Sequence, residues 1–372
     1  AIPFFILAGN IMNKGGIAIR LINLAKIVTG RTPGGLAQTN ILANALFGAI
    51  SGSGTAAASA MGSIIGPIEK DEGYDPNFSA AANIATAPTG LLIPPSNVMI
   101  TFSLVSGGTS VAALFMAGYI PGALWALACM LVVYIYAKKA GYRSQTKLTG
   151  KEKFNAFIQA LPCLLLIVIV IGGIIAGVFT ATEGSVVAVV YSLLLSIYGY
   201  KSMKWKDLPE IFRASAEMTG IIIFLIGVSS IMSWVMAFTN IPTMVSNGLL
   251  SISSNKYVIL LMINIILLVV GTFMDMTPAT LIFTPIFLPV CTALGMNTIH
   301  FGIMLIFNLC IGTITPPVGT TLFVGVKVGG VKIETVFKHL LPYFFAIIVV
   351  LMLVTYIPQL SLWLPGLMGY VS

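Results

Sequence analysis

Residues 271–278 have the sequence GTFMDMTP and place one carboxylate, Asp275, between two apolar segments. Upstream, Val258 to Val270 contains a single polar side chain, Asn264, and downstream, Ala279 to Val290 is apolar except for threonines and prolines. Neither segment supplies a positive partner for the carboxylate. Because an ionisable group at membrane depth is costly and usually functional, Asp275 is the first candidate for a binding residue.

The residues around Asp275 also interrupt the helix. Gly271, Thr277 and Pro278 disfavour a continuous helix, and the carbonyl groups that they free are tolerated at membrane depth only beside a polar cavity. Carbonyl oxygens and one carboxylate together suit a hard cation. The alternative interpretation is that Asp275 caps the amino terminus of a half-helix.

A second copy of this pattern lies in the first half of the chain. Aligning the chain with itself so that Ser53 falls on Asp275, without a gap, brings another glycine-interrupted polar stretch, Ser51 to Thr55, onto the first. The same offset superposes Thr55 on Thr277, Pro67 on Pro289, Gly73 on Gly295, Gly90 on Gly312, Pro94-Pro95 on Pro316-Pro317 and Gly107-Gly108 on Gly329-Gly330. The chain is therefore a duplication, and paired interrupted segments in corresponding halves predict a transporter binding site.

The composition is that of a membrane protein. The chain has 372 residues, of which 58% are hydrophobic and 8% charged, and its mean hydropathy is +1.01, so we predict an all-α, multi-pass integral membrane protein in a lipid bilayer. The net charge of +8 resides in short loops between apolar runs, which argues against nucleic acid as a partner. The four cysteines lack CxxC spacing and the two histidines are isolated from acids, so we expect these residues to form neither a disulfide nor a metal site.

Each half is predicted to contain a re-entrant helical hairpin followed by a broken transmembrane helix. The hairpin arms are shorter than the ~20 residues that a spanning helix needs, and the broken helices carry a glycine and a Pro-Pro pair near their centres. We place the first repeat at residues 1–153, with hairpin 36–67 and broken helix 78–105, and the second repeat at residues 154–372, with hairpin 257–290 and broken helix 301–326.

The remaining segments complete a topology of two inverted repeats. They are a helix end at 1–12, interfacial helices at 17–29 and 201–213, spans at 111–137, 161–178, 184–200, 218–238 and 333–356, and a surface helix at 241–252. Threading them through a bilayer puts every Lys and Arg except Lys256 on one side, with the polar loop Lys138 to Lys153 in the cytoplasm. The repeat also predicts that one or two spans of about 20 residues precede Ala1.

The hairpin tips and the helix breaks supply two equivalent candidate cation sites, because both present helix ends and unpaired carbonyl groups. The predicted cation-binding residues are Ser51, Ser53, Gly90, Ile93 and Pro94 in the first half and Thr272, Asp275, Gly312, Thr315 and Pro316 in the second. The space between the tips, where the amino termini of half-helices favour an anion, is the predicted substrate site. Its predicted residues are Thr55, Ser96, Asn97, Thr277, Gly319 and Thr320. By contrast, Glu183 opens a helix, so we expect it to be structural.

Four motifs resemble those of a known family. They are Ser51-Gly52-Ser53-Gly54-Thr55, Gly90-Leu91-Leu92-Ile93-Pro94-Pro95-Ser96, Phe179-Thr180-Ala181-Thr182-Glu183 and Gly312-Thr313-Ile314-Thr315-Pro316-Pro317-Val318-Gly319. In this order they resemble the large membrane subunit of tripartite ATP-independent periplasmic (TRAP) transporters over nearly the whole chain. The resemblance implies an elevator-type secondary transporter of the bacterial inner membrane that imports an organic acid anion with at least two sodium ions. It also implies two partners, a small four-helix membrane subunit, separate or fused, and a periplasmic substrate-binding protein.

The substrate is suggested by fewer residues. Asn97 after Pro-Pro-Ser, with Ala85-Thr86-Ala87-Pro88-Thr89 before it, resembles the sialic-acid (N-acetylneuraminate) branch, and a C4-dicarboxylate or another carboxylate is the alternative. A stand-alone sodium/anion carrier that needs no binding protein is a further alternative. The spans contain no Ser/His/Asp grouping, HExxH or paired aspartates, so we do not expect an enzyme. Duplicated broken helices favour alternating access over a channel.

Overall fold

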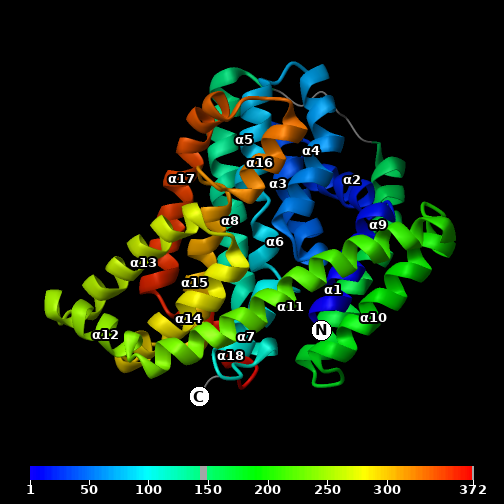
Figure 1. The fold of residues 1–372 in the computed structure, drawn as a ribbon. Coiled ribbons are helices and arrows are strands. Elements are labelled where there is room, and N and C mark those ends of the chain that lie inside the picture. Colours follow the sequence, from blue (N-terminus) through cyan, green and yellow to red (C-terminus); the bar gives the residue numbers. More distant parts are fainter. Residues whose placement is uncertain (143–148, 371–372) are drawn as a thin grey trace.

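The computed structural model describes residues 1–142 and 149–370, and these residues form an all-helical protein (Figure 1). In this part of the chain, seven helices are long and apolar enough to cross a membrane, or up to nine spans exist if each bent helix pair counts as one. The predicted multi-pass helical protein is confirmed. Residues 143–148, in the middle of the predicted cytoplasmic loop, lie outside the described residues.

The first half contains the predicted hairpin and broken helix. The hairpin arms are α3 (Gly35–Ser51) and α4 (Gly54–Asp71), which pack against each other. The broken helix consists of α5 (Pro76–Thr86), α6 (Thr89–Leu92) and α7 (Asn97–Val105), and the long helix α8 (Val111–Ala140) follows. The break is wider than predicted because Pro88, which has no N–H to donate, interrupts the helix ahead of Gly90.

The same helices recur in the second half. The second hairpin is α13 (Lys256–Phe273) with α14 (Met276–Ala293), and the second broken helix is α15 (Thr298–Thr313) with α16 (Thr320–Gly329), followed by α17 (Ile333–Tyr356). The offset that places Ser53 on Asp275 also carries both bounds of α4 onto those of α14, and the first residue of α8 onto the first residue of α17. The helices therefore repeat with the register that the sequence predicts.

The two halves interlock through their hairpins. The arm α4 packs on α16 and, correspondingly, α14 packs on α7, so the second arm of each hairpin lies against the second part of the other broken helix. Figure 1 shows α4 near the top of the molecule and α14 near the bottom. Residues 299–313 of α15 and 78–86 of α5 are all buried, so the broken helices form the core of the protein.

Each hairpin crosses its own broken helix at a pair of glycines. A Cβ atom added to Gly90 would lie 2.3 Å from the Cα atom of Gly48, and a Cβ atom added to Gly312 would lie 2.4 Å from the carbonyl oxygen of Gly271. Backbones approach this closely only where neither residue has a side chain. These crossings hold each hairpin tip against the break of its partner helix.

The other helices surround this core, and their bounds correct three predictions. They are α1 (Ile2–Lys14), α2 (Ile17–Thr29), α9 (Gly150–Ile175), α10 (Ala181–Leu194) with a π-helical end at Leu195–Gly199, α11 (Leu208–Phe238), α12 (Ile241–Ile252) and α18 (Gln359–Leu367). The segment 201–213 is not one interfacial helix, because Pro209 favours a helix start and α11 begins at Leu208. The predicted loop 138–153 is shorter, because Thr149 and Glu152 form a capping box that starts α9. A further short helix, α18, follows the last predicted span.

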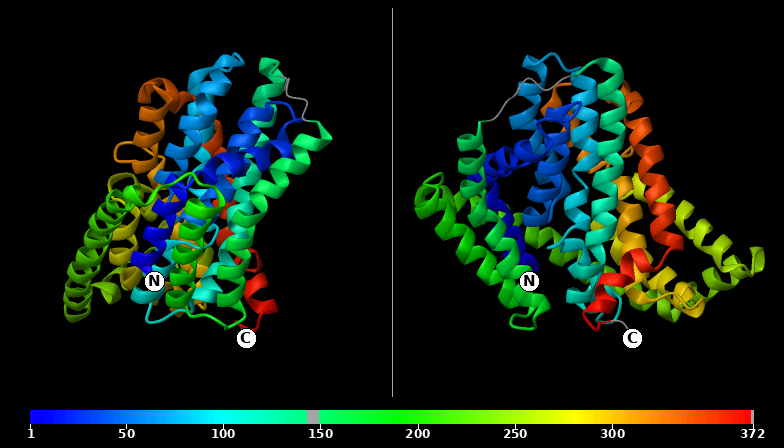
Figure 2. Two further views of the ribbon diagram at one scale, coloured as in Figure 1. Left: turned by 90° about the vertical axis from the view of Figure 1, so that its right-hand side faces the viewer. Right: turned by 180° about the vertical axis from the view of Figure 1, so that it is seen from behind.

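The outer helices expose apolar side chains, as expected for surfaces that face lipid. Phe154 and Val168 of α9 and Phe224 and Trp234 of α11 are more than half exposed. The two views in Figure 2 show α12 and the adjoining end of α11 projecting from the rest of the molecule. Such surfaces belong in a bilayer or against another membrane subunit.

We predict that Lys151 faces the cytoplasm and Thr239 the periplasm, because the basic residues gather on one side of the predicted topology. Both residues are exposed, and the four native cysteines are buried, so a single cysteine introduced at either position can be labelled against a low background. A membrane-impermeant maleimide added to intact cells should label Thr239→Cys and should label Lys151→Cys only after permeabilisation. The reverse pattern would overturn the topology.

Candidate functional site

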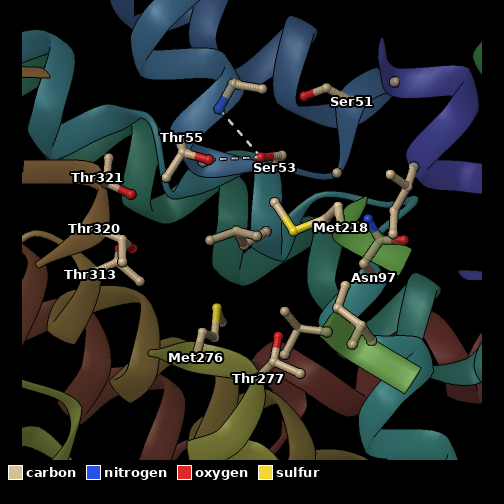
Figure 3. Close-up of a pocket in the computed structure, with 18 of the residues that line it drawn as sticks. Ser51, Ser53, Thr55, Asn97, Met218, Met276, Thr277, Thr313, Thr320 and Thr321 are labelled. Carbon is tan, nitrogen blue, oxygen red and sulfur yellow. Dashed lines mark hydrogen bonds between the residues drawn. The ribbon is translucent and has the colours of Figure 1, made fainter. Parts of the chain in front are cut away.

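The two hairpin tips meet at one cavity of about 310 Å³ (Figure 3). Among the residues that line it are seven of those predicted from the sequence, namely Ser51, Ser53, Thr55, Asn97, Asp275, Thr277 and Thr320. The other lining residues are Ile6, Gly9, Asn10, Gly52, Gly54, Ala56, Leu91, Val98, Ala214, Met218, Ile222, Met276, Thr313 and Thr321. The structure therefore brings both tips, and side chains next to both helix breaks, into a single site.

The first tip is a sharp turn that presents hydroxyl groups. Gly52 has a positive φ of 61°, and a Cβ atom there would lie 2.7 Å from the Pro95 carbonyl oxygen, so only glycine fits. The Ser53 hydroxyl caps α4 by accepting the Ala56 N–H at 3.3 Å, and it lies 3.2 Å from the Thr55 hydroxyl. The hydroxyl of Ser51 is buried and has no hydrogen-bond partner among the described residues.

The second tip presents a carboxylate. Asp275 precedes α14, but its side chain accepts no N–H from the first turn of that helix, so the alternative interpretation of Asp275 as a capping residue is wrong. The Thr320 hydroxyl instead donates to the Asp275 Oδ1 atom at 3.3 Å. Asp275 is exposed toward the cavity, with free lone pairs for a further ligand. The two equivalent positions therefore differ, since Ser53 caps its helix and Asp275 does not.

The remaining predicted residues lie outside the cavity lining. They are Gly90, Ile93, Pro94, Ser96, Thr272, Gly312, Thr315, Pro316 and Gly319. Ser96 is fully buried and its hydroxyl donates to the Leu91 carbonyl at 2.6 Å, while the Val318 N–H donates to the Thr272 carbonyl at 3.1 Å. These two hydrogen bonds lie outside the cavity lining. The first stabilises the break of the first broken helix, and the second connects the break of the second broken helix to its hairpin tip.

The charge of the cavity is negative. Asp275 is the one charged residue among those that line it, and the described lining contains no Lys, Arg or His. The other polar groups are hydroxyls and the Asn10 and Asn97 amides, and the Asn97 Oδ1 atom is buried without a hydrogen-bond partner. Such a lining can coordinate a cation directly, but it can hold an anion favourably only if a cation accompanies it.

One wall of the cavity was not predicted. Asn10 on α1, Met218 on α11 and Thr313 on α15 all line it, and the Asn10 amide donates to the Ser215 hydroxyl at 2.8 Å. The one sequence signal was the polar Asn10 in the otherwise apolar run Ile2 to Met12. Thr321 also lines the cavity, as expected from its place just after the second Pro-Pro pair, and its buried hydroxyl has no partner among the described residues. The cavity therefore lies between the hairpin tips and the surrounding helices α1 and α11.

The predicted structural role of Glu183 is confirmed. It forms a capping box with Thr180 at the start of α10, in which the Thr180 N–H donates to Glu183 at 2.8 Å. In return, the Glu183 N–H donates to the Thr180 hydroxyl at 3.2 Å, so both residues help to start the helix.

Comparisons with known proteins give a consistent result. The family model described as "Tripartite ATP-independent periplasmic transporter, DctM component" matches residues 1–360. The chain is 55% identical over 367 residues to the uncharacterized protein YgiK of Salmonella typhimurium. This alignment covers 99% of this chain and 84% of YgiK. It is 37% identical over 371 residues to the sialic acid TRAP transporter large permease protein SiaM of Vibrio cholerae (100% and 87% covered). It is 36% identical over 382 residues to the C4-dicarboxylate TRAP transporter large permease protein DctM of Rhodobacter capsulatus (99% and 87% covered).

The fold is similar to that of a solved transporter. The crystal structure of the Alcanivorax borkumensis YdaH transporter, described as having an unusual topology, superposes with a TM-score of 0.64 at 12% sequence identity, covering 100% of this chain and 85% of that one. At this identity the likeness shows the fold alone.

Proposed function

This chain belongs to the DctM family of tripartite ATP-independent periplasmic transporters, and we propose that it couples sodium entry to the import of an organic acid anion. It is a multi-pass permease of the inner membrane and not an enzyme. The proposed coupling goes beyond family membership, and it depends on the charge of the cavity between the hairpin tips.

The negative charge of that cavity is the observation that carries the proposal. An anion placed beside Asp275 would repel it, because like charges brought together at a binding site cost several kcal/mol. No basic side chain among the described lining residues offsets this repulsion. Sodium ions bound at the tips would offset it, so that each ligand would strengthen the binding of the other to the same degree.

Two sodium ions would bind at equivalent positions of the two repeats. The first site would use Ser51 and Ser53 with the carbonyl groups of Gly90, Ile93 and Pro94, and the second would use Asp275 with Thr272, Gly312, Thr315 and Pro316. The unpartnered Ser51 hydroxyl and the uncapped Asp275 carboxylate support these assignments, since both leave oxygen atoms available as ligands. The recurrence of the tip and break helices at one constant offset along the chain supports the equivalence of the sites.

The substrate would occupy the cavity and contact Thr55, Asn97, Thr277 and Thr320, with Ser96 and Gly319 shaping the wall behind them. Relatives named for sialic acid and for C4-dicarboxylates match the chain at nearly equal identity, so overall similarity does not distinguish the two substrates. The proposed substrate is therefore argued from the residues that line the cavity. Asn97 lines the cavity, and its amide could pair with the hydroxyl and amide groups of sialic acid. An ionised dicarboxylate without a hydroxyl group, such as succinate, has no donor. This favours sialic acid, with a C4-dicarboxylate or another carboxylate as the second candidate.

The proposed mechanism is alternating access with two partners. The repeats would be inverted, and the positions of α4 and α14 near opposite ends of Figure 1 support this. The hairpins and broken helices would move together as an elevator against α1, α2 and α9–α11. A small four-helix membrane subunit would contact the exposed apolar helices, and a periplasmic binding protein would deliver the substrate.

The proposed function predicts uptake with a triple requirement. In reconstituted liposomes, radiolabelled sialic acid should accumulate only when an inward sodium gradient, the small subunit and the binding protein are all present. The same assay with radiolabelled succinate tests the second candidate. Replacing sodium by potassium at equal ionic strength is the control. Uptake by this chain alone would favour the stand-alone carrier, and uptake that does not depend on sodium would exclude the coupling.

A further inference from the structure

A second cavity, of about 190 Å³, lies away from the hairpin tips, where α13 and α15 begin and where α17 is followed by α18. Its lining residues are Lys256, Tyr257, Leu260, Gly295, Met296, Asn297, His300, Thr355, Tyr356, Pro358 and Leu362. None of them lines the cavity at the tips, and the mechanism proposed above does not use them. Figure 2 shows α18 (red) at the lower edge of the molecule in both views, so this cavity lies near one end of the spanning helices.

This second cavity holds a positive charge that no acid neutralises. Lys256 is half-buried and takes part in none of the ion pairs among the described residues. After Glu217 the sequence contains two acids, Asp275 and Glu334, which lie at the far ends of α13 and α17, each roughly 30 Å away at the rise of an α-helix. The helices that pack against the lining helices, α5 to α8, α14 and α16, contain no Asp or Glu.

Two helix ends add to the positive charge of Lys256. Helix α13 begins at Lys256 itself, and α15 begins directly after the lining residue Asn297. The amino terminus of a helix carries a partial positive charge, so a lysine at this position is unfavourable for the helix. The arrangement becomes favourable when an anion lies between the helix ends and the lysine. In the predicted topology every other Lys and Arg lies on the cytoplasmic side, so Lys256 does not serve as a topology signal.

His300 supplies a buried polar group that faces the same cavity. Its side chain is 3% exposed, and its Nε2 atom lies 2.8 Å from the Val354 carbonyl oxygen. A carbonyl group only accepts, so Nε2 carries a hydrogen atom and the neutral ring keeps a lone pair on Nδ1. None of the described residues donates a hydrogen bond to that Nδ1 atom. The fitting ligand therefore combines an anionic group with a hydrogen-bond donor.

The first repeat shows how the fold fills the equivalent place when it holds no such groups. At the constant offset between the repeats, the counterparts of the lining residues Met296, His300 and Pro358 are Tyr74, Phe78 and Tyr136. The rings of Phe78 and Tyr136 stack with their centroids 4.1 Å apart, and Phe78 is fully buried. The counterpart of Lys256 is Gly34, which has no side chain. The lysine and the histidine are therefore particular to the second repeat, and the helices form without them.

We propose that this second cavity binds the headgroup of an anionic phospholipid, phosphatidylglycerol being the simplest that fits. Lys256 and the two helix ends would hold the phosphate, and the Nδ1 atom of His300 would accept a hydrogen bond from a headgroup hydroxyl. The cavity has ample room for such a group, since one buried water needs only about 10–15 Å³. Because Lys256 lies on the predicted periplasmic side, the lipid would belong to the periplasmic leaflet.

The surface beside the cavity favours a lipid over a soluble partner. The lining residues Tyr257 and Tyr356 pair with their ring centroids 5.8 Å apart, and tyrosines are enriched at the level of lipid headgroups. Apolar side chains on the adjoining turns of α13 and α17 are exposed, namely Val258, Leu261 and Leu353. Acyl chains would cover these side chains while the headgroup occupies the cavity.

Lipid binding to the purified transporter, without substrate or sodium, tests the proposal independently of the proposed function. Thermal stability in a neutral detergent is titrated with dioleoyl phosphatidylglycerol, and dioleoyl phosphatidylcholine is the zwitterionic control with the same acyl chains. The wild type should show a saturable rise in melting temperature with phosphatidylglycerol alone. Lys256→Gln should weaken the apparent affinity roughly fivefold or more, because one lysine near a membrane surface contributes about that factor.

Two further variants sharpen the test. His300→Phe introduces the residue that fills the equivalent place in the first repeat, so it should remove the saturable effect of phosphatidylglycerol. Lys332→Gln removes an exposed lysine next to the opposite end of α17 and should leave the affinity unchanged. If His300→Phe does not fold, the comparison of Lys256→Gln with Lys332→Gln decides the outcome.

Four results would overturn the proposal. The first is an equal effect of phosphatidylglycerol and phosphatidylcholine on the wild type, and the second is the same phosphatidylglycerol affinity in Lys256→Gln and Lys332→Gln. The third is equally tight, Lys256-dependent binding of soluble glycerol phosphate, which would assign the cavity to a free anion. The fourth is a loss of binding to the periplasmic binding protein in Lys256→Gln with lipid affinity unchanged, which would assign the cavity to that protein.

Discussion

Replacing Asp275 with asparagine is expected to abolish most sodium-dependent uptake while leaving the protein folded. The substitution keeps the shape of the side chain and removes its charge. Among the described residues, the Asp275 carboxylate makes one side-chain hydrogen bond, with the Thr320 hydroxyl at 3.3 Å, so we expect the fold to be kept. Removing one partner of a close charge pair costs about 2 kcal/mol or more, which is roughly a thirtyfold loss of sodium affinity. Sodium titrations of uptake and of thermal stability in the purified variant measure the two effects separately.

Ser53→Ala is the matched comparison, because Ser53 occupies the equivalent position in the first repeat. A neutral hydroxyl contributes about 0.5–1.5 kcal/mol, so the loss in sodium affinity should stay within roughly tenfold. Each variant should still bind sodium at the other site but should show a lower Hill coefficient for sodium. Glu183→Gln, which alters an exposed carboxylate far from the cavity, should leave sodium dependence unchanged. Unchanged sodium dependence in Asp275→Asn would remove Asp275 from the site.

The second large effect is expected from Gly90→Ala. The added Cβ atom would lie 2.3 Å from the Cα atom of Gly48, and neither backbone can move without separating the first hairpin from its broken helix. Overpacking of this kind costs about 3 kcal/mol. The melting temperature of the purified protein should therefore fall by several degrees, and uptake should fall with it because the first tip is displaced.

Gly172→Ala is the control, since a Cβ atom at Gly172 meets nothing within 4 Å and alanine favours a helix over glycine. It should leave the melting temperature unchanged or raise it slightly. Gly312→Ala should repeat the loss at the second crossing, where the Cβ atom would lie 2.4 Å from the Gly271 carbonyl oxygen. A melting temperature for Gly90→Ala equal to that of Gly172→Ala would show that the crossing can relax.

The helices that repeat could be predicted from sequence, because each helix bound inferred in one half can be compared with the equivalent position in the other half. The start of α14 at Met276 and the start of α4 at Gly54 follow from one offset, and the glycines and Pro-Pro pairs mark the breaks. Where a proline has no counterpart in the other half, the observed helix bounds differ from the predicted ones. Pro88 adds a break that the pattern at Gly90 did not suggest, and Pro209 starts α11 early.

Side-chain direction and long-range packing could not be predicted in the same way. Ser96 follows a Pro-Pro pair as expected of a substrate residue, yet the backbone after the break directs its hydroxyl to Leu91. Met218 reaches the cavity because α11 packs across α14, a contact between segments that share no sequence pattern. Glu69 belongs to the charged run Glu69 to Glu72, yet it is buried, because α5 and α16 pack on α4. Each of these outcomes depends on tertiary contacts.

The packing of α4 on α16 and of α14 on α7 has a consequence for leakage. A carrier whose two ion sites could change sides of the membrane separately would let sodium pass without cargo and would dissipate the gradient that drives it. Because the second arm of each hairpin packs on the other repeat, we expect a displacement of one tip to displace the other. In the proposed cycle, ions and anion would therefore cross in a single event, with a fixed stoichiometry and little futile sodium flux.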